Sequence, residues 1–251
     1  MLVKDTNMIK TPLASVMLAL GLGGCHFIDF QFAPGVQGSG KSATQQRTLE
    51  SFHAIEAGGA LVIHVKVASG SPSTAQLTGD DNLLPLIETQ VRNGVLHIGS
   101  KKHYSAKSRI EVLVNASELT ALDVSGATSA DVQGVKADKF SANLSGASKL
   151  TLEGTIKDLE VEESGASEIT LRNLLCKTVG AELDGASSLT ATGASEQADL
   201  IGSGASSFKL AEFKIGSAKV QLDGGSNGEI NVTGDLKADV SGAANLRYQG
   251  K

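Results

Sequence analysis

The sequence predicts an all-β fold, a right-handed parallel β-helix with turns of about 19 to 20 residues and a strand-rich N-terminal capping portion. Two patterns and one energetic argument lead to this fold class. A small tetrapeptide recurs at a nearly constant interval, apolar residues alternate on both sides of it, and one such unit is too small to fold alone. These features are typical of a solenoid, in which each turn packs on its neighbours.

The tetrapeptide, Ser-Gly-Ala-Ser in its commonest form, occurs seven times in the repeat region 119–251. Its glycines follow one another after 20, 19, 20, 19, 20 and 18 residues. Because glycine adopts backbone conformations closed to other residues, we expect each copy to form a corner between two strands. The predicted structural corner glycines are Gly126, Gly146, Gly165, Gly185, Gly204, Gly224 and Gly242.

The last residue of the tetrapeptide carries a hydroxyl group in six of the seven copies, from Thr128 to Ser226. We expect these hydroxyls to lie inside the corners and to form a column bonded along the solenoid axis. The alternative is an exposed ladder that binds a regular ligand, such as a glycan or an ice lattice.

Apolar residues alternate with polar ones around each corner. Two, four and six residues before Gly146 stand Leu144, Ala142 and Phe140, and Leu150 stands four residues after it. A period of two is the mark of half-buried strands, whereas a helix requires a period of 3.6. The sequence therefore predicts a strand on each side of every corner.

Energetics requires the turns to stack. One turn offers about five inward apolar side chains, each worth at most about 1.5 to 3 kcal/mol when buried. Ordering about twenty residues costs about 1 to 2 kcal/mol apiece in backbone entropy. Turns stacked at about 4.8 Å in parallel register bury both sides of each side chain and satisfy the backbone. Parallel crossovers favour the right-handed coil.

Two turns depart from the apolar pattern at the position two residues before the glycine, where Glu163 and Gly202 stand. A buried carboxylate without a partner is costly, so we expect either a partner for Glu163 or a bulge that turns it outward. The bulge on a solvated acidic strand is favoured over a cation or catalytic site. Cys176 follows two leucines, which indicates a buried structural thiol rather than a nucleophile.

The first residues have the layout of a signal peptide, predicted over 1–24. Lys4 and Lys10 precede a short run of small apolar residues, which is too short to span a bilayer as a mature helix. Met8 is an alternative start. The run ends Leu-Gly-Gly before Cys25 and resembles the lipobox of bacterial lipoproteins.

The lipobox resemblance implies that Cys25 is lipidated and that the protein is anchored to a membrane. His26, rather than Asp, follows the cysteine, which implies the outer membrane of the cell envelope, with the protein facing the periplasm or the cell surface. The alternative is an ordinary signal peptide with an incidental cysteine. The segment 25–46 is rich in Gly, Ser and Gln and is predicted to be a flexible tether.

The region 47–117 lacks the tetrapeptide but is rich in predicted strands. Residues 61–67 alternate, and Asn93-Gly94 between apolar residues predicts a two-residue hairpin turn. Polar residues from Asp80 onward precede a short capped helical turn that Pro85 limits. We expect this region to cover the upper end of the solenoid, because an uncovered sheet edge favours association. The last turn lacks such a cover, so a homo-oligomer is an alternative.

Three segments carry a resemblance to a known family. Residues 52–60, 77–84 and 93–98 resemble the opening of the head GIN domain of the auto-transporter adhesin family, whose members continue into Ser-Gly-Ala-Ser repeats. The resemblance covers about residues 47–248, within a predicted domain at 47–251. It implies an exported β-helical protein and brings no binding or catalytic residues. The lipoprotein-like leader departs from the auto-transporter pattern.

Composition argues against several function classes. The chain has 22 Lys and Arg against 27 Asp and Glu, a formal net charge of -5, which disfavours nucleic acid as a partner. The five arginines are scattered, Trp is absent, and the five histidines show no metal-ligand spacing. The sequence therefore predicts no catalytic residues, no metal site and no cofactor.

The expected function is a non-catalytic binding or adhesion module anchored at the cell envelope, with a glycan or a protein as ligand. The alternative is a structural protein that assembles through its terminal turn, and a glycan-active enzyme is the least favoured reading. Ser125, Asp184 and Asp223, which precede corner glycines, and the strand around Glu163 are the first candidate positions for a site.

Overall fold

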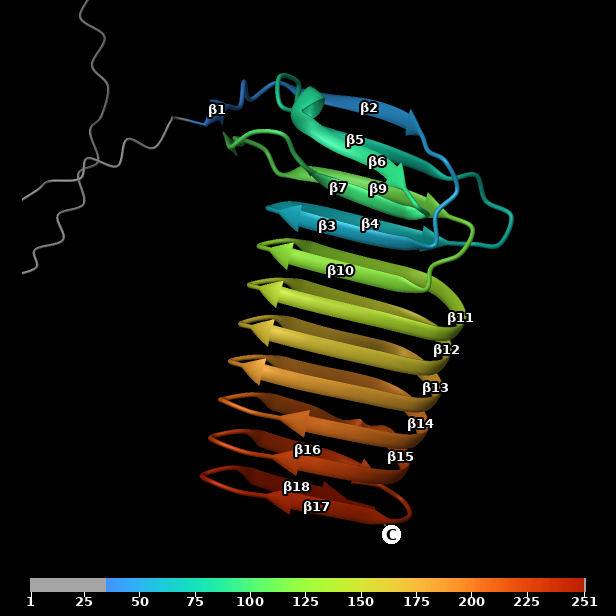
Figure 1. The fold of residues 1–251 in the computed structure, drawn as a ribbon, viewed down its shortest axis with the longest axis vertical. Helices are drawn as coiled ribbons and strands as arrows, with labels where there is room; N and C mark the ends of the chain where they lie inside the picture. Colours follow the sequence, from blue (N-terminus) through green and yellow to red (C-terminus); the bar gives the residue numbers. More distant parts are fainter. Residues whose placement is uncertain (1–34, 251) are drawn as a thin grey trace, which may run out of the picture. The chain divides into compact units, whose positions relative to one another are not determined.

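The structure is a computed structural model that describes residues 35–250. The predicted signal peptide, Cys25 and the first part of the tether lie outside the described residues. The described unit is built from strands that coil into a parallel β-solenoid (Figure 1). Each turn crosses the near face from right to left and returns behind while the chain descends, so the coil is right-handed. The predicted fold class is confirmed.

Parallel strands make up the solenoid. They are β10 (Ala121–Gly126), β11 (Ser129–Gly146), β12 (Lys149–Gly165), β13 (Glu168–Gly185), β14 (Ser188–Gly202), β15 (Ser207–Leu222), β16 (Asn227–Val232), β17 (Leu236–Val240) and β18 (Asn245–Gln249). The long ones, β11 to β15, each include a bend. Neighbouring turns pair in parallel, and the register shifts once at the bend, for example between Glu153 and Thr155 in β12. This bend lies opposite the tetrapeptide corner, so each turn has two straight sides.

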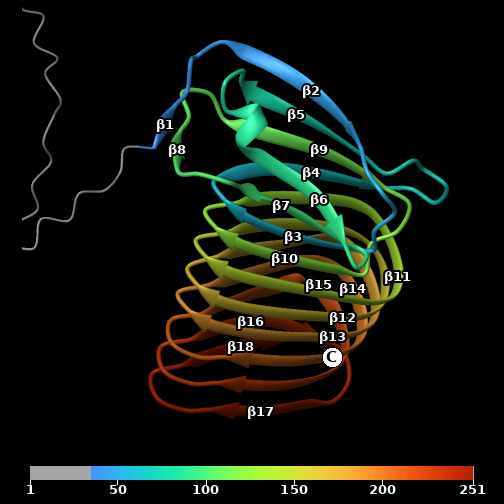
Figure 2. The same ribbon diagram turned by 45° about the horizontal axis from the view of Figure 1, so that its top comes forward.

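Above the solenoid lies the cap. Its elements are β1 (Val36–Gln37), β2 (Ser42–Thr48), β3 (Ala54–Gly59), β4 (Leu61–Val67), β5 (Thr74–Asp80), the 3-10 turn η1 (Leu84–Leu86), β6 (Ile87–Arg92), β7 (Val95–Ser100), β8 (Tyr104–Ser105) and β9 (Ile110–Ala116). Strands β3 and β4 pair in parallel with β10 and β11, and β7 and β9 continue the parallel stack. Antiparallel β6, β5 and β2 end it (Figure 2). Further parallel growth is blocked there.

The hairpin predicted at Asn93-Gly94 is confirmed. Strands β6 and β7 are antiparallel, and both turn residues have positive φ, 51° and 77°. The predicted helical turn is present as η1, but it contains Pro85 and has no side-chain cap. Asp80 does not cap it because its carboxylate accepts the backbone N–H groups of Gly40, Lys107 and Ser108.

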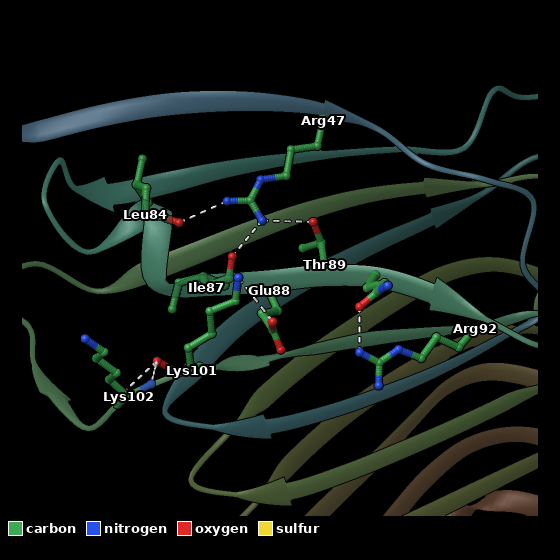
Figure 3. A network of polar contacts seen from close by, with 10 residues as sticks. Arg47, Leu84, Ile87, Glu88, Thr89, Arg92, Lys101 and Lys102 are labelled. Carbon is green, nitrogen blue, oxygen red and sulfur yellow. Dashed lines mark hydrogen bonds and ion pairs between the residues drawn. The ribbon is translucent and has the colours of Figure 1, made fainter.

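The tether predicted over 25–46 is wrong at its C-terminal end. Residues 42–48 form β2, which pairs along its whole length with β5. Arg47 on this strand donates to the carbonyl oxygens of Ile87 and Leu84, at 2.7 and 2.9 Å (Figure 3). Strand β2 is an edge strand with mostly exposed polar side chains, so its sequence has little apolar alternation to reveal it.

Inward side chains form continuous columns along the axis. One column on the near side is in register from turn to turn and each member is at most 4% exposed. Its members are Leu122, Ala142, Val161, Ala181, Leu200 and Val220. Every residue of the column packs on its counterparts in the turns above and below. The hydrophobic core is therefore formed between turns and not within a single turn.

The corner glycines adopt the left-handed backbone conformation, with φ between 70° and 112°. A Cβ at Gly165 would lie 2.5 Å from the carbonyl oxygen of Gly146 in the turn above. That oxygen accepts the N–H of Ala166 at 2.8 Å. The corners therefore need glycine for two reasons: the positive φ of the backbone, and the close approach of the turn above.

The hydroxyls of the corners are buried, between 0 and 3% exposed, so they do not form an exposed ladder. The expected axial column is present only in part: the Ser167 hydroxyl accepts the N–H of Ser148 from the neighbouring turn at 3.2 Å, but other hydroxyls bond within their own corner. Ser148, Ser187 and Ser226 each donate to the carbonyl oxygen three residues earlier in the same corner, at 2.7 to 2.8 Å. That carbonyl is the nearer acceptor, as in other hydroxyl turns. Ser206 does bond along the axis, to the hydroxyl of Ser226 at 3.1 Å.

Glu163 points into the core, and the outward bulge favoured for it is wrong. Its strand keeps one register from Asp158 to Gly165, and Glu163 is 4% exposed between Leu144 and Leu183. Its Oε1 accepts the N–H of Ser167 at 2.9 Å, while Oε2 has no partner. The alternative prediction, that Glu163 has a partner, is therefore confirmed for one of its two oxygens. This oxygen is the acceptor of a buried N–H in the corner.

Candidate functional site: a groove along the solenoid

A long hollow on the described unit, here called the side groove, runs along the solenoid just after the bend of each turn. Its volume is about 1360 Å³. It is lined by residues 118–120, 136–141, 158–160, 178–180, 197–199, 217–219 and 235–237. Seven successive levels thus contribute the same part of the turn, so the groove repeats with the solenoid.

The floor of the side groove is apolar. In six of the seven levels, one residue of the floor points inward, and these six residues stack in register. They are Phe140, Leu159, Val179, Ala198, Ala218 and Leu236. The side chains shrink from Phe140 to Ala218 while exposure rises from 1% to 7%, so the floor is most accessible where it is lined by alanine.

Two polar rows form the walls. One row stacks Lys139, Asp158, Thr178, Gln197 and Ser217, and the other stacks Ser141, Glu160, Gly180, Asp199 and Lys219. Several of the charges within the rows have partners: Thr178 donates to Asp158 at 2.7 Å, and the Lys219 ammonium lies 3.5 Å from Asp199. The walls therefore offer hydrogen-bonding groups of both kinds and little excess charge at the centre.

Gly180 has no structural reason to be glycine. Its φ is not positive, and a Cβ there would meet only Glu160 Cγ at 3.7 Å and Leu159 O at 3.9 Å, which are ordinary contacts. Glycine inside a strand weakens it and often marks a place where a ligand approaches closely. Among glycines of residues 35–250, Gly99 and Gly225 alone share this freedom, and six of the seven corners carry Ala where Gly225 stands.

The positions that the sequence analysis put first do not line the side groove. Asp184 accepts from the Ser203 hydroxyl at 2.6 Å and its own corner N–H, which lowers its pKa. The pKa of Asp223 is lowered likewise, first by the Gly224 N–H and then by the Ser241 hydroxyl. Both aspartates therefore stabilise their corners through these hydrogen bonds. Ser125 lies in a second hollow, beside the cap.

The sequence reasoning missed Gly180 and the small floor residues. The signal that could have found them is a glycine at an outward strand position, away from every corner. Such a glycine is found when the residues at one position are compared through all turns, rather than when each turn is considered alone.

The chemistry of the remaining candidates is structural. Burial raises the pKa of the Cys176 thiol to about 12, so it is a poor nucleophile at neutral pH. Within residues 35–250, no group of three His, Cys, Asp or Glu side chains is placed to hold a metal ion. In the same range, no helix has the length and apolar character needed to cross a bilayer.

Fold and groove together define a parallel β-solenoid with a repeating lateral surface. The sequence profile of the family described as "Putative auto-transporter adhesin, head GIN domain" matches residues 51–251. The chain belongs to this family, which confirms the resemblance found in its sequence. A search of curated protein sequences returned no match.

Solved structures share the fold. A putative adhesin from Parabacteroides merdae superposes with a TM-score of 0.79 at 23% identity, covering 87% of this chain and 93% of its own. A putative lipid binding protein from Parabacteroides distasonis gives 0.72 at 16% identity, with 86% and 97% covered. A putative adhesin from the same species gives 0.70 at 23%, with 86% and 97% covered.

Proposed function

We propose that the protein is a non-catalytic lipoprotein of the cell envelope whose solenoid is a binding or adhesion module. Its ligand is an extended polymer, a glycan or a protein segment, that lies along the side groove. The observation that carries the proposal is the side groove itself, in which seven levels repeat one floor and two walls around the unconstrained Gly180. Membership in an adhesin family supports it.

The dimensions of the side groove suit an extended ligand. Turns stack at about 4.8 Å, so the six steps between seven levels span about 29 Å. An apolar floor with polar walls contacts the faces of a chain and hydrogen-bonds its edges. Since the levels are alike in backbone and differ in side chains, affinity is expected to accumulate with ligand length.

Binding assays with graded ligands test this proposal. Printed arrays of linear oligosaccharides and of linear peptides, each in a series of increasing length, are the probes. We expect affinity to rise with length in one of the two series and then to level off when the groove is filled. Binding that is independent of length in both series, or absent from both, would overturn the proposal.

Gly180→Thr supplies the matched variant, because the new side chain would fill the groove without strain in the fold. Gly225→Ala is the control, since it fills an equally unconstrained glycine at a corner. We expect Gly180→Thr to lose length-dependent binding and Gly225→Ala to keep it. Equal affinities for the two variants would place the ligand elsewhere.

The membrane anchor rests on the sequence of the leader, with Cys25 as the lipidated residue and the outer membrane as the destination. Cys25→Ser is expected to move the protein from the membrane fraction to the soluble fraction of the cell. Protease treatment of intact cells then separates the two orientations, because a surface-facing module is cleaved and a periplasmic one is protected. A Cys25→Ser protein that stays in the membrane fraction would refute lipid anchoring.

A second candidate function is end-to-end assembly of copies, which would bury the last described turn. Its apolar side chains are open to solvent, with Val240 41% and Tyr248 71% exposed. An uncovered edge of parallel strands is a template for pairing. Sedimentation at increasing concentration tests this candidate: growth that Tyr248→Asp abolishes supports it, and a monomer at all concentrations excludes it.

A further inference from the structure

A second hollow lies beside the cap and shares no residue with the side groove. This cap hollow has a volume of about 720 Å³, within the range of about 300 to 1,000 Å³ typical of small-molecule sites. It lies on the face where β6, β7, β3 and β10 follow one another down the molecule (Figure 2). Figure 3 shows Arg92 at one end of β6 and Lys101 and Lys102 beside its other end.

The floor of the cap hollow consists of small residues. Gly58 pairs in register with Ser125 on β10, and on the other side Gly99 follows the Ala57–Ile98 pair. A Cβ at Gly99 would have no atom within 4 Å, and its φ is not positive. Gly99 is thus a second glycine inside a strand that the fold does not require, and it opens the centre of the hollow.

One wall is a polar ladder across four strands. Gln90, His97, Glu56 and Asp123 stand side by side in register. His97 Nδ1 lies 3.0 Å from Glu56. Burial, and then the charge of Glu56, raises the pKa of Asp123. The ladder supplies a row of hydrogen-bond acceptors of the kind that hold sugar hydroxyls.

The other wall is the loop that joins β7 to β8. It carries Lys101, Lys102 and His103, and it ends at Tyr104, whose half-buried ring packs against the core. A partly buried aromatic ring offers an apolar face beside a wet cavity, and its hydroxyl adds a polar contact. This wall is the basic side of the hollow.

Three Lys or Arg and three Asp or Glu side chains line the cap hollow, but two of these cations have no carboxylate partner. Lys101 pairs with Glu88 at 3.3 Å, and His97 is occupied by Glu56. In contrast, no carboxylate of residues 35–250 lies within 4.0 Å of the charged groups of Arg92 or Lys102. Arg92 donates only to the neutral Gln90 side chain, at 2.6 Å. These two cations lie at opposite ends of β6, and Lys102 is the one on the Gly99 side of the hollow, where it remains for an anionic group.

We propose that the cap hollow binds a carboxylated sugar. Its hydroxyls bond the ladder of Glu56 and Asp123, its carboxylate is attracted by Lys102, and its ring lies over the floor that Gly99 leaves open. Charge-assisted hydrogen bonds of lysine and arginine to carboxylates are among the stronger polar contacts in proteins. This site is independent of a polymer in the side groove.

Calorimetric titration of the folded protein tests the ligand class. The probes are galacturonate, galactose and acetate. Galacturonate is expected to bind about tenfold or more tightly than either control, since each control lacks one of the two interactions. Equal affinity for acetate would leave an anion site and overturn the sugar assignment, equal affinity for galactose would overturn the role of the cations, and no binding of galacturonate would overturn the whole proposal.

Variants locate the site. Gly99→Thr fills the floor, and Lys102→Gln removes one cation from an exposed loop; both are expected to weaken galacturonate binding by about tenfold or more. Gly180→Thr and Gly225→Ala, which lie outside the hollow, are expected to bind it as the wild type does. Melting temperatures verify that all four variants fold. Unchanged affinity in folded Gly99→Thr protein would refute the location.

Discussion

Two glycine-containing regions of the molecule, the corners and the two hollows, differ in why they contain glycine. At a corner such as Gly165, the positive φ of 112° and the nearby carbonyl oxygen of Gly146 exclude any side chain. At Gly180 and Gly99 the backbone is ordinary and a Cβ would fit. A glycine that the backbone geometry requires is explained by folding. A glycine that weakens its strand and is not required by the geometry is a candidate for a functional role.

The largest effect is expected at a corner. Gly165→Val should lower the free energy of unfolding by about 3 kcal/mol, because it adds backbone strain and a clash with the turn above. Urea denaturation followed by circular dichroism measures it. The neighbouring change Ser164→Ala should be nearly silent, and equal stability of Gly165→Val and wild type would contradict the corner geometry.

Glu163 belongs with the corners as a position that the fold requires, although its side chain breaks the apolar pattern. Glu163→Ala should cost about 1 to 3 kcal/mol, because the buried N–H of Ser167 loses its acceptor. Glu163→Gln keeps an acceptor oxygen and should remain close to wild type. Thermal melts of the two variants test this, and a Gln variant as unstable as the Ala variant would show that the carboxylate charge is what matters.

Asp80 extends the comparison to the cap. Burial alone would raise its pKa, but the N–H groups of Lys107, Ser108 and Gly40 hold it below the ordinary value of 3.8. The unfolded chain therefore binds this proton more tightly than the folded chain. The stabilisation is complete above about pH 4 and is lost as the pH falls through the lower, folded-state pKa.

Hydrogen exchange of the Gly40, Lys107 and Ser108 amides measures this loss. We expect their protection to fall in acid before that of the solenoid strands. Asp80→Asn, which has a single side-chain acceptor oxygen, should show weak protection already at neutral pH. Protection that is the same in wild type and variant at every pH would disprove the role of the carboxylate.

The smallest effect has the opposite sign and sharpens the comparison most. Gly180→Thr and Gly99→Thr should each stabilise the protein by about 0.5 to 1 kcal/mol, because glycine is unfavourable inside a strand. Melting temperatures should rise slightly for both. A fall of the melting temperature in either variant would mean that its glycine is structural after all.

The solenoid was predictable because its determinants are local and repeated. The spacing of the glycines and the alternation around Phe140 and Leu150 need no knowledge of distant contacts. The direction of Glu163 was not predictable in the same way, since it depends on which buried N–H lies within reach. Strand β2 was missed because an exposed edge strand has no apolar alternation.

The two hollows could not be predicted from the sequence of any single turn. The side groove exists because residues such as Val179 and Ala198, 19 positions apart, stand in register. The cap hollow requires Glu56, His97 and Asp123 to meet from three separate strands. Their positions follow from strand pairing, which the amino-acid pattern constrains only within the repeats.

Because the corners share one backbone geometry, whole turns of the solenoid are interchangeable units. Excision of residues 166–185 would join Gly165 directly to Ala186 and restore an intact Gly-Ala-Ser corner. Such a deletion shortens the side groove by one step of about 4.8 Å and leaves both ends of the molecule unaltered. Duplication of the same segment lengthens it by the same amount. Gene-level gain or loss of whole turns can therefore change the length of the side groove without any new fold having to evolve.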